Sequence, residues 1–320
     1  MKWLSDGKLN HLRTIVNDPD FSSTKYTFIK ELGRGGMGTV YLAEDRELNR
    51  LVAVKVLNAP EVTEDVRRRM IREAQIIAGL EHPGIVPVHD VGTLPDGQVF
   101  YAMKFVRGSR LDEYAAQGAS LRDRMRKFQA VCDAVAFAHA HGVIHRDLKP
   151  QNIMIGSFGE VLVLDWGVAK VRPQMNADEH RSIRVHARQS ASNQTMDGTV
   201  IGTRDYMSPE QARGEVDRID ERADVYSLGA VLHFLLAGQG SKTAKAICLK
   251  AMAQVTESRY ASASELSADI GRLLDAEPVL AYRENTFERV SRWVGKNRFL
   301  VLLILAYLLM RIFLIFTSRP

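Results

Sequence analysis

The chain has 320 residues, which suggests one large or two medium globular units. Its hydrophobic content of 46% is ordinary for a packed core, so wholesale disorder is excluded. The formal charge of +5, from 43 basic and 38 acidic residues, is a mild excess that does not favour a nucleic-acid-binding protein.

The cysteine content and the N-terminal sequence indicate the kind of cellular compartment in which the chain folds. Cys132 and Cys248 are the only cysteines, and both lie in apolar stretches of predicted helix. We therefore expect small core residues in a reducing compartment, without disulfides or a zinc site. Residues 1–25 form an N-terminal extension to which we assign no function, and residues 1–10 hold no apolar run typical of a signal peptide.

The first predicted elements are β-strands around a glycine-rich turn. β-Branched and aromatic residues dominate 26–29, 39–42 and 51–54. Four glycines separate the first two runs: Gly33, Gly35, Gly36 and Gly38. Glycine lets the backbone approach phosphate oxygens and present its N–H groups to them. Because 40–42 continues as strand, where a dinucleotide-binding fold would open a helix, the pattern favours a flap over a nucleotide.

Lys55 and Glu73 form a candidate ion pair. Lys55 ends the apolar strand 52–54, and a lysine in that place usually only carries its charge to solvent. Glu73 lies near the apolar stripe of the predicted helix 63–80, where a carboxylate is usually a surface group. The functional alternative is that Glu73 pairs with Lys55 and aims it at the α- and β-phosphates of a nucleotide. The spacing alone does not decide between these interpretations.

Two further strands, a crossover and two helices lead to the centre of the chain. Residues 85–106 are predicted as strands around a turn at 95–97, and 104–108 as the crossover that ends the β-rich part. From Leu111 the pattern becomes helical, and 128–141 is predicted as a buried helix.

The segment 145–152, with the sequence His-Arg-Asp-Leu-Lys-Pro-Gln-Asn, carries the densest chemistry. Apolar residues flank it on both sides, so we predict a polar loop held between two buried segments. It combines the carboxylate of Asp147, the ammonium of Lys149 and the amide of Asn152. Phosphoryl transfer uses this mixture: an acceptor for a hydroxyl proton, a cation for phosphate and an oxygen ligand for Mg²⁺. The alternative is a chance polar loop.

Beyond this loop, an aspartate follows a second buried strand. Asp165 comes directly after the apolar run 161–164, where its carboxylate is placed to bind a metal. Residues 172–198 are rich in Ser, Arg, Asn and Gln and are predicted as a mobile loop, because they are too polar to pack. Further helices are predicted at 224–237, 244–253 and 262–275.

The C-terminal segment changes character. Five basic residues precede it: Arg283, Arg289, Arg292, Lys296 and Arg298. The next eighteen residues, 299–316, are apolar or small except Arg311, and as a helix they span roughly 27 Å, enough for a bilayer core. We predict a transmembrane helix over 299–317, with Arg311 reaching outward and the basic residues facing the cytoplasm. The alternatives are a helix docked on the domain or lying in the membrane interface.

In this order, the motifs of residues 26 to about 280 resemble those of bacterial membrane-anchored Ser/Thr protein kinases, of the eukaryotic-like protein kinase family. The segment Leu-Gly-Arg-Gly-Gly-Met-Gly at 32–38 is typical of these proteins. The resemblance implies an α+β, two-lobed fold with a β-rich N-lobe and a helical C-lobe. It places the kinase domain at 26–280, with the N-lobe at 26–103, the hinge at 104–108 and the C-lobe at 109–280. A basic juxtamembrane segment would follow at 281–298 and a transmembrane helix at 299–317.

The resemblance also implies a role for each motif residue. Asp147 would accept the proton of the substrate hydroxyl, and four residues would complete the catalytic set: Lys149, Asn152, Lys55 and Glu73. Asn152 and Asp165 would hold Mg²⁺. A set of side chains and glycines would bind ATP: Leu32, Gly33, Gly35, Gly36, Gly38, Val40, Ala53, Lys55, Met103, Phe105, Met154 and Asp165.

Further matches concern the frame of the site. Met103 resembles the gatekeeper beside the hinge, and Thr203 resembles a threonine of the substrate loop. Glu210 and Arg259 resemble the buried pair that ties the activation segment to the large lobe. Asp224 resembles the helix-capping aspartate that holds the catalytic loop.

Three departures from the family pattern matter. Trp166 stands where Phe is usual, and we expect the larger aromatic to fill the same core position without loss of activity. The segment that follows is longer than usual, and we predict autophosphorylation at Thr195 or Thr199, with Arg146 placed to pair with the phosphate. Third, the C-lobe lacks the proline-rich loop and helix that the family places between 228–237 and 245–247. We expect this loss to expose apolar surface on the neighbouring helix and to weaken the fold.

We therefore predict an enzyme, a Ser/Thr protein kinase that transfers the γ-phosphoryl group of Mg-ATP to protein hydroxyls. ATP and Mg²⁺ are its cofactors, the protein substrate and the membrane are its partners, nucleic acid is not a partner, and a homodimer is left open. We place it in the cell membrane as a single-pass protein with a cytoplasmic kinase domain. Two alternatives remain: a membrane-tethered pseudokinase without turnover, which the shortened C-lobe favours, and a small-molecule kinase, which Pro209-Glu210 disfavours.

Overall fold

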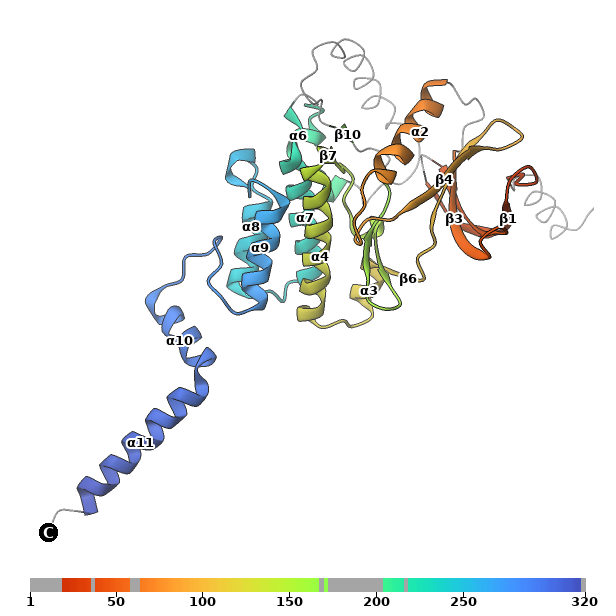
Figure 1. Cartoon of the computed structure of the whole chain (residues 1–320). Coiled ribbons are helices and arrows are strands. Elements are labelled where there is room, and N and C mark those ends of the chain that lie inside the picture. The colour runs from red at the N-terminus through yellow and green to blue at the C-terminus, as the bar shows by residue number, and fades with distance from the viewer. Residues whose placement is uncertain are drawn as a thin grey trace, which may run out of the picture.

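The structure, a computed structural model, describes residues 19–35, 38–57, 64–166, 170–171, 204–215 and 218–317. Figure 1 shows a β-rich lobe, a helical lobe and two C-terminal helices that extend away from both. The predicted two-lobed α+β fold is confirmed by this arrangement.

The N-lobe is a five-stranded antiparallel sheet with the spatial order β1-β2-β3-β5-β4. Its strands are β1 (Tyr26–Gly35), β2 (Gly38–Asp45), β3 (Arg50–Val56), β4 (Val88–Thr93) and β5 (Val99–Lys104). Helix α2 (Glu64–Ala78) contacts β4 and β5. Its buried residues Met70, Ala74 and Ile77 recur every three or four positions, which places them on one face.

The glycine-rich turn joins two strands, as predicted. Gly35 pairs with Gly38, so the β1–β2 hairpin closes around residues 36–37, which lie outside the described ranges. Gly38 is required sterically, because a Cβ at this position would collide with the carbonyl oxygen of Val56 on β3. The turn therefore opens no helix, which excludes the dinucleotide-binding alternative.

The C-lobe is built on α4, which packs against α7 and α9. Its helices are α3 (Leu111–Ala116), α4 (Leu121–Ala140), α6 (Pro209–Ala212), α7 (Glu221–Leu236), α8 (Lys242–Ala251) and α9 (Ala263–Leu274). Short helices occur at η1 (Pro150–Asn152), η2 (Arg204–Tyr206) and η4 (Thr256–Ser258). Two small sheets frame the centre: β6 (Gly108–Arg110), β8 (Ile153–Gly156) and β9 (Val161–Val163), and β7 (Val143–Ile144) with β10 (Lys170–Val171).

One apolar core runs through both lobes. It joins Ala53 and Met103 of the sheet to Phe128 of α4 and Leu228 of α7. A smaller core covers the other face of the sheet, where aromatic rings meet edge to face: Phe21, Tyr26, Tyr41 and Phe100. Both cysteines are free and buried, which confirms the prediction that they are core residues.

The shortened part of the C-lobe is closed by direct packing of α8 on α7. Gly229 makes this contact tight, because a Cβ there would lie 2.8 Å from the Cβ of Ala251. On α7 itself the one exposed large apolar residue is Phe234, at 37%. The expected exposure of that helix is therefore largely wrong. The large apolar side chain that is exposed here is Leu249, at 73%, on α8, which packs against α7 and α9.

The chain ends in α10 (Thr286–Lys296) and α11 (Arg298–Thr317), which project beyond the C-lobe (Figure 1). The segment 299–317 is helical, as predicted. Within the ranges that the structure describes, no helix has both the length and the apolarity needed to cross a membrane. The prediction of a transmembrane helix is thus not confirmed; several side chains of α11, including those of 314–317, lie outside the described residues.

Candidate active site

A buried carboxylate at the start of α7 holds the loop 145–152. Asp224 is fully buried, and its oxygens accept hydrogen bonds from the backbone N–H groups of His145 and Arg146, each at 2.8 Å. The Nε2 atom of His139 lies 2.8 Å from the same carboxylate. Burial raises the pKa of Asp224, but the hydrogen bonds from His139 and the backbone donors lower it by more. The pKa of Asp224 therefore lies below its ordinary value. Asp224 therefore stands where the family resemblance places the loop anchor.

Arg146 adopts a left-handed backbone conformation with φ of 71°. Such a conformation costs about 1–3 kcal/mol for a residue other than glycine, so its surroundings must hold it. Asp224 binds its N–H group, and the Nε2 atom of Gln211 donates to its carbonyl oxygen at 2.9 Å. The loop is thus held on both sides of one strained residue.

His145 connects the loop to the strand that precedes Asp165. Its Nδ1 accepts a hydrogen bond from the Asp147 N–H group at 3.3 Å, so the proton lies on Nε2. Nε2 then donates to the carbonyl oxygen of Leu164 at 2.9 Å. The imidazole also packs on Trp166, with ring centroids 4.6 Å apart. This bridge places the two acidic residues of the predicted site at neighbouring positions.

Three side chains predicted for catalysis meet within the loop. The Nζ atom of Lys149 lies 2.7 Å from Oδ2 of Asp147. Asn152 Nδ2 donates to the same oxygen at 3.1 Å and to the Asp147 carbonyl oxygen at 2.8 Å. Both donors use Oδ2, and among the described residues no donor contacts Oδ1. Oδ1 is therefore the carboxylate oxygen that remains open to a further donor.

Lys55 of β3 and Asp165, two residues beyond β9, form a second cluster. Lys55 Nζ lies 2.7 Å from Oδ1 of Asp165, and the Lys55 side chain is only 8% exposed. The alternative in which Lys55 merely reaches solvent is therefore excluded. Desolvation raises the pKa of Asp165, but the Lys55 ammonium outweighs it, and the pKa lies below its ordinary value. The predicted partner Glu73 lies on α2, and its side chain falls outside the described residues.

The two clusters adjoin, and their oxygen atoms suit Mg²⁺. The Leu164 N–H group donates to the Asn152 carbonyl oxygen at 2.8 Å, which brings the chain of Asp165 beside that of Asn152. Mg²⁺ takes oxygen ligands and usually binds one or two protein groups together with substrate phosphates. In the described ranges, no group of three or more His, Cys, Asp or Glu residues could hold a metal. The Asn152 amide and the Asp165 carboxylate supply oxygen atoms of the kind that Mg²⁺ takes from a protein when it binds together with substrate phosphates.

The predicted ATP-binding residues lie on adjoining strands. Register pairs Gly33 with Val40 and Val40 with Lys55 in one row across the sheet. Ala53 pairs with Met103 in a second row, two residues away along β3. Phe105 follows β5 directly. The other predicted ATP-binding residues lie on three strands: Leu32, Gly33 and Gly35 on β1, Gly38 on β2 and Met154 on β8. Gly36 lies outside the described residues.

The frame of the activation segment contains a buried ion pair. Arg259 donates from Nη1 and Nη2 to the two oxygens of Glu210, at 2.7 and 2.8 Å, and both residues are buried. Trp166 is also buried and donates from Nε1 to the Val163 carbonyl oxygen at 3.3 Å, so the larger aromatic does fill a core position. The predicted mobile loop lies outside the described residues, as do three candidate threonines: Thr195, Thr199 and Thr203.

His139 and Gln211 were not identified from the sequence. His139 is the partner of Asp224, and Gln211 binds the Arg146 carbonyl. A signal for His139 exists, since a histidine on the buried face of a helix needs a polar partner. For Gln211, which follows Glu210 directly, we find no such signal.

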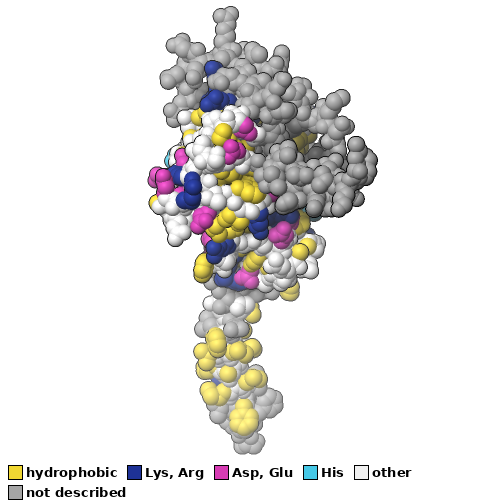
Figure 2. Space-filling model, turned by 90° about the vertical axis from the view of Figure 1, so that its right-hand side faces the viewer, with side chains coloured by type: hydrophobic (Ala, Val, Ile, Leu, Met, Phe, Trp, Pro, Cys, Tyr) yellow, Lys and Arg dark blue, Asp and Glu magenta, His cyan; other side chains and the backbone are white. Residues whose placement is uncertain are grey.

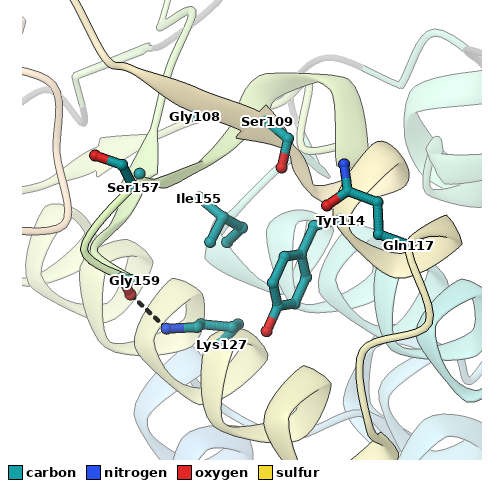
Figure 3. A pocket seen from close by; sticks show the side chains of 9 residues that line it. Gly108, Ser109, Tyr114, Gln117, Lys127, Ile155, Ser157 and Gly159 are labelled. Atoms are coloured by element: carbon teal, nitrogen blue, oxygen red, sulfur yellow. Dashed lines mark hydrogen bonds between the residues drawn. The ribbon is translucent and has the colours of Figure 1, made fainter.

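A separate cavity of about 490 Å³ lies between α3, α4 and the β8–β9 turn (Figure 3). Ser109, Tyr114 and Gln117 line one side, and Lys127, which donates to the Gly159 carbonyl oxygen, lines another. None of the predicted catalytic or ATP-binding residues lines it, so it is not part of the candidate site.

Similarity to known proteins agrees with this geometry. A family model described as the protein kinase domain matches residues 26–277. The serine/threonine-protein kinase PknD of Protochlamydia amoebophila is 38% identical over 226 residues, which cover 66% of this chain and 23% of that protein. PknB of Mycobacterium tuberculosis is 37% identical over 298 residues, covering 82% of this chain and 45% of that protein. This chain thus spans less than half the length of these two relatives.

Solved structures are similar as well. The crystal structure of the Mycobacterium tuberculosis PknI kinase domain matches with a TM-score of 0.57 and 26% identity, covering 78% of this chain and 96% of that domain. The match to the family model extends over both lobes and includes the loop 145–152, Lys55 and Asp165. On these grounds, the chain belongs to the protein kinase family.

Proposed function

We propose that this chain is a bacterial Ser/Thr protein kinase that transfers the γ-phosphoryl group of ATP to hydroxyls of a protein substrate. The observation that carries the proposal is the adjacency of the Lys55–Asp165 pair to the Asp147, Lys149 and Asn152 cluster. The relatives named above are serine/threonine-protein kinases, and Lys149 is the residue by which the loop resembles that class.

The chemistry asked of the protein is mostly placement of charge. Lys55 would bind the α- and β-phosphates, while Asp165 and Asn152 would hold Mg²⁺, which when bound neutralises phosphate charge. Asp147 would accept the proton of the substrate hydroxyl at Oδ1, and Lys149 would steady the γ-phosphate. The ionised state of Asp165, set by Lys55, suits it to a cation rather than to proton transfer.

Transfer of labelled phosphate from ATP by the full chain tests the proposal. We expect Asp165→Ala and Asp147→Asn each to lower the rate at least about a hundredfold, since each removes a group that acts on the transferred phosphate. Asp275→Asn, which changes an exposed carboxylate at the end of α9, should leave the rate unchanged. Equal background from the wild type and from Asp165→Ala would instead favour the pseudokinase.

We also propose that the kinase phosphorylates its own activation segment at Thr195 or Thr199. Arg146 Nε is buried and has no hydrogen-bond partner among the described residues, which leaves a cation beside the catalytic loop for a phosphate. Phosphopeptide mapping of the wild type and of Asp165→Ala would test this. Finding neither threonine modified in an active wild type would contradict it.

A third proposal concerns location. We propose that the segment 299–317 attaches the chain to the cell membrane as a single-pass anchor, with the kinase domain in the cytoplasm. Large apolar side chains are exposed along α11, including Phe299, Leu303 and Leu309 at 74%, 69% and 66%. Figure 2 shows hydrophobic side chains covering this projecting helix. A helix that is apolar all round is usually buried in a large protein or in a membrane.

Fractionation of expressing cells tests the attachment. We expect the full chain in the membrane fraction, retained after an alkaline wash, and 1–298 in the soluble fraction. Release by the wash would favour a helix lying in the interface instead. Protease added to sealed cells should leave the kinase domain intact if it is cytoplasmic.

A further inference from the structure

Helix α10 carries an apolar face that the kinase domain leaves exposed. Phe287, Val290 and Val294 follow one another at spacings of three and four, and Trp293 lies beside them. Their exposed fractions are 80%, 59%, 37% and 51% for Phe287, Val290, Val294 and Trp293. Four large apolar residues on a single face of a short helix are more than scattered surface exposure explains.

The rest of α10 is polar, and exposed cations lie in it and just before it. Arg283 before the helix and Arg289 within it are exposed. Arg292 is paired with Glu284 at 2.8 Å, and Glu288 accepts a hydrogen bond from the Tyr282 hydroxyl at 3.0 Å. A helix with an aromatic and aliphatic face next to exposed cations suits the interface of an anionic membrane.

Hydrogen bonds tie the start of α10 to the kinase domain. The buried carboxylate of Asp269 accepts from the N–H groups of Leu280 and Ala281, at 2.7 and 3.0 Å, and from the Tyr260 hydroxyl at 2.8 Å. Asn285 then caps α10 by accepting from the Glu288 N–H group at 2.8 Å. No long free linker therefore separates the C-lobe from α10.

The other end of α10 continues almost directly into α11. Asn297 N–H donates to the Trp293 carbonyl oxygen at 2.9 Å, and Val301 N–H donates to the Asn297 carbonyl oxygen at 3.0 Å. A single residue, Asn297, separates the two helices. If α11 enters a bilayer, α10 is carried to its surface, where a tryptophan is a favoured residue.

We propose that α10 lies in the headgroup region of an anionic membrane, with Phe287, Val290, Trp293 and Val294 inserted. It thereby fixes how the C-lobe faces that membrane. The proposal rests on the membrane attachment proposed for α11, and it adds a second lipid contact. The acidic lipid is the partner that the exposed cations select. We expect the apolar face to insert about 5–10 Å into the boundary between headgroups and acyl chains.

Fluorescent labelling of single cysteines in the full chain tests the proposal. An environment-sensitive probe is attached at Phe287→Cys, Val294→Cys or, as matched control, Gly295→Cys. Gly295 follows Val294 but lies on the face of Glu288, and a Cβ at Gly295 meets nothing within 4 Å. Both native cysteines are buried, so the wild type should take up little probe. The labelled chains are reconstituted into vesicles of phosphatidylcholine and phosphatidylglycerol, with and without brominated lipid.

We expect brominated lipid to quench the probe at Phe287→Cys and Val294→Cys by about twofold or more, and the probe at Gly295→Cys much less. Vesicle-bound chains without quenching at any position would overturn the proposal and leave the α11 anchor standing. Equal quenching at all three positions would also overturn it, because α10 would then lie wholly inside the bilayer. Failure to bind vesicles would refute the anchor and this inference together. If a second copy of the chain or the C-lobe covered this face of α10 instead, brominated lipid would not quench the probes on it, and the proposal would be overturned.

Discussion

The catalytic loop and the C-terminal helices depart in opposite ways from the rule that polar groups are exposed and apolar ones buried. The loop buries polar groups, whereas the helices expose apolar side chains. Around 145–152, backbone polar groups are buried and paired: Asp224 accepts from the N–H groups of His145 and Arg146, and Gln211 donates to the Arg146 carbonyl oxygen. In α10 and α11, many large apolar side chains remain exposed. Buried polar groups are stable only when they are paired, whereas a large exposed apolar surface needs an external partner. The first departure holds the loop 145–152 in place, and the second is the basis of the membrane attachment proposed above.

The largest expected effect comes from breaking the loop anchor. Asp224→Ala leaves two backbone N–H groups and His139 without their acceptor, so we expect the free energy of unfolding to fall by about 3–5 kcal/mol. Urea unfolding followed by circular dichroism measures this, with Asp275→Ala as the same change at an exposed carboxylate. A loss below about 1 kcal/mol would mean that the loop does not depend on this group.

A smaller effect is expected where α7 meets α8. Gly229→Ala adds a Cβ that would lie 2.8 Å from the Cβ of Ala251, so the helices must separate. We expect a destabilisation of about 1–3 kcal/mol in urea. Gly295→Ala on α10 is the control, because its Cβ meets nothing within 4 Å, and it should be neutral or slightly stabilising. Equal effects of the two changes would contradict the contrast between the packed lobe and the exposed helices.

The buried pair Glu210–Arg259 predicts a pH dependence of stability. Burial raises the pKa of Glu210, but the hydrogen bonds from Arg259 outweigh it, and the pKa lies below the ordinary 4.5. The stability contributed by this carboxylate is thus full above 4.5 and is lost as the pH falls through the lower folded-state pKa.

Thermal unfolding of the wild type and of Glu210→Gln across this range checks the sign. We expect the variant to be less stable at neutral pH, and the difference between the two proteins to shrink on acidification. A difference that grows as the pH falls would show that the folded-state pKa is raised instead.

The smallest effect on stability is expected on α11. Leu303→Gln changes a side chain that is 69% exposed, so we expect the unfolding free energy of the kinase domain to change by less than about 0.5 kcal/mol. The same change should reduce recovery in the membrane fraction if the proposed anchor is correct. A clear destabilisation in detergent would indicate that α11 packs on the domain.

The sequence by itself determined the local elements and the identity of the chemical groups. Periodicity identified the strands, the glycine hairpin and the apolar C-terminal segment, since the pattern of burial along an element repeats with its geometry. The motif 145–152 also identified which side chains carry the chemistry, because their spacing within one loop is short. Two assignments of long range, Glu210 with Arg259 and Asp224 with the loop, came only from resemblance to a family.

Only the tertiary structure decided which distant groups meet. Lys55 and Asp165 are 110 positions apart, and no local pattern shows that they lie 2.7 Å from each other. The roles of His139 and Gln211, and the close packing of α8 on α7, likewise depend on how whole elements pack. Local preferences act over a few residues, whereas these contacts result from burying one continuous core shared by both lobes.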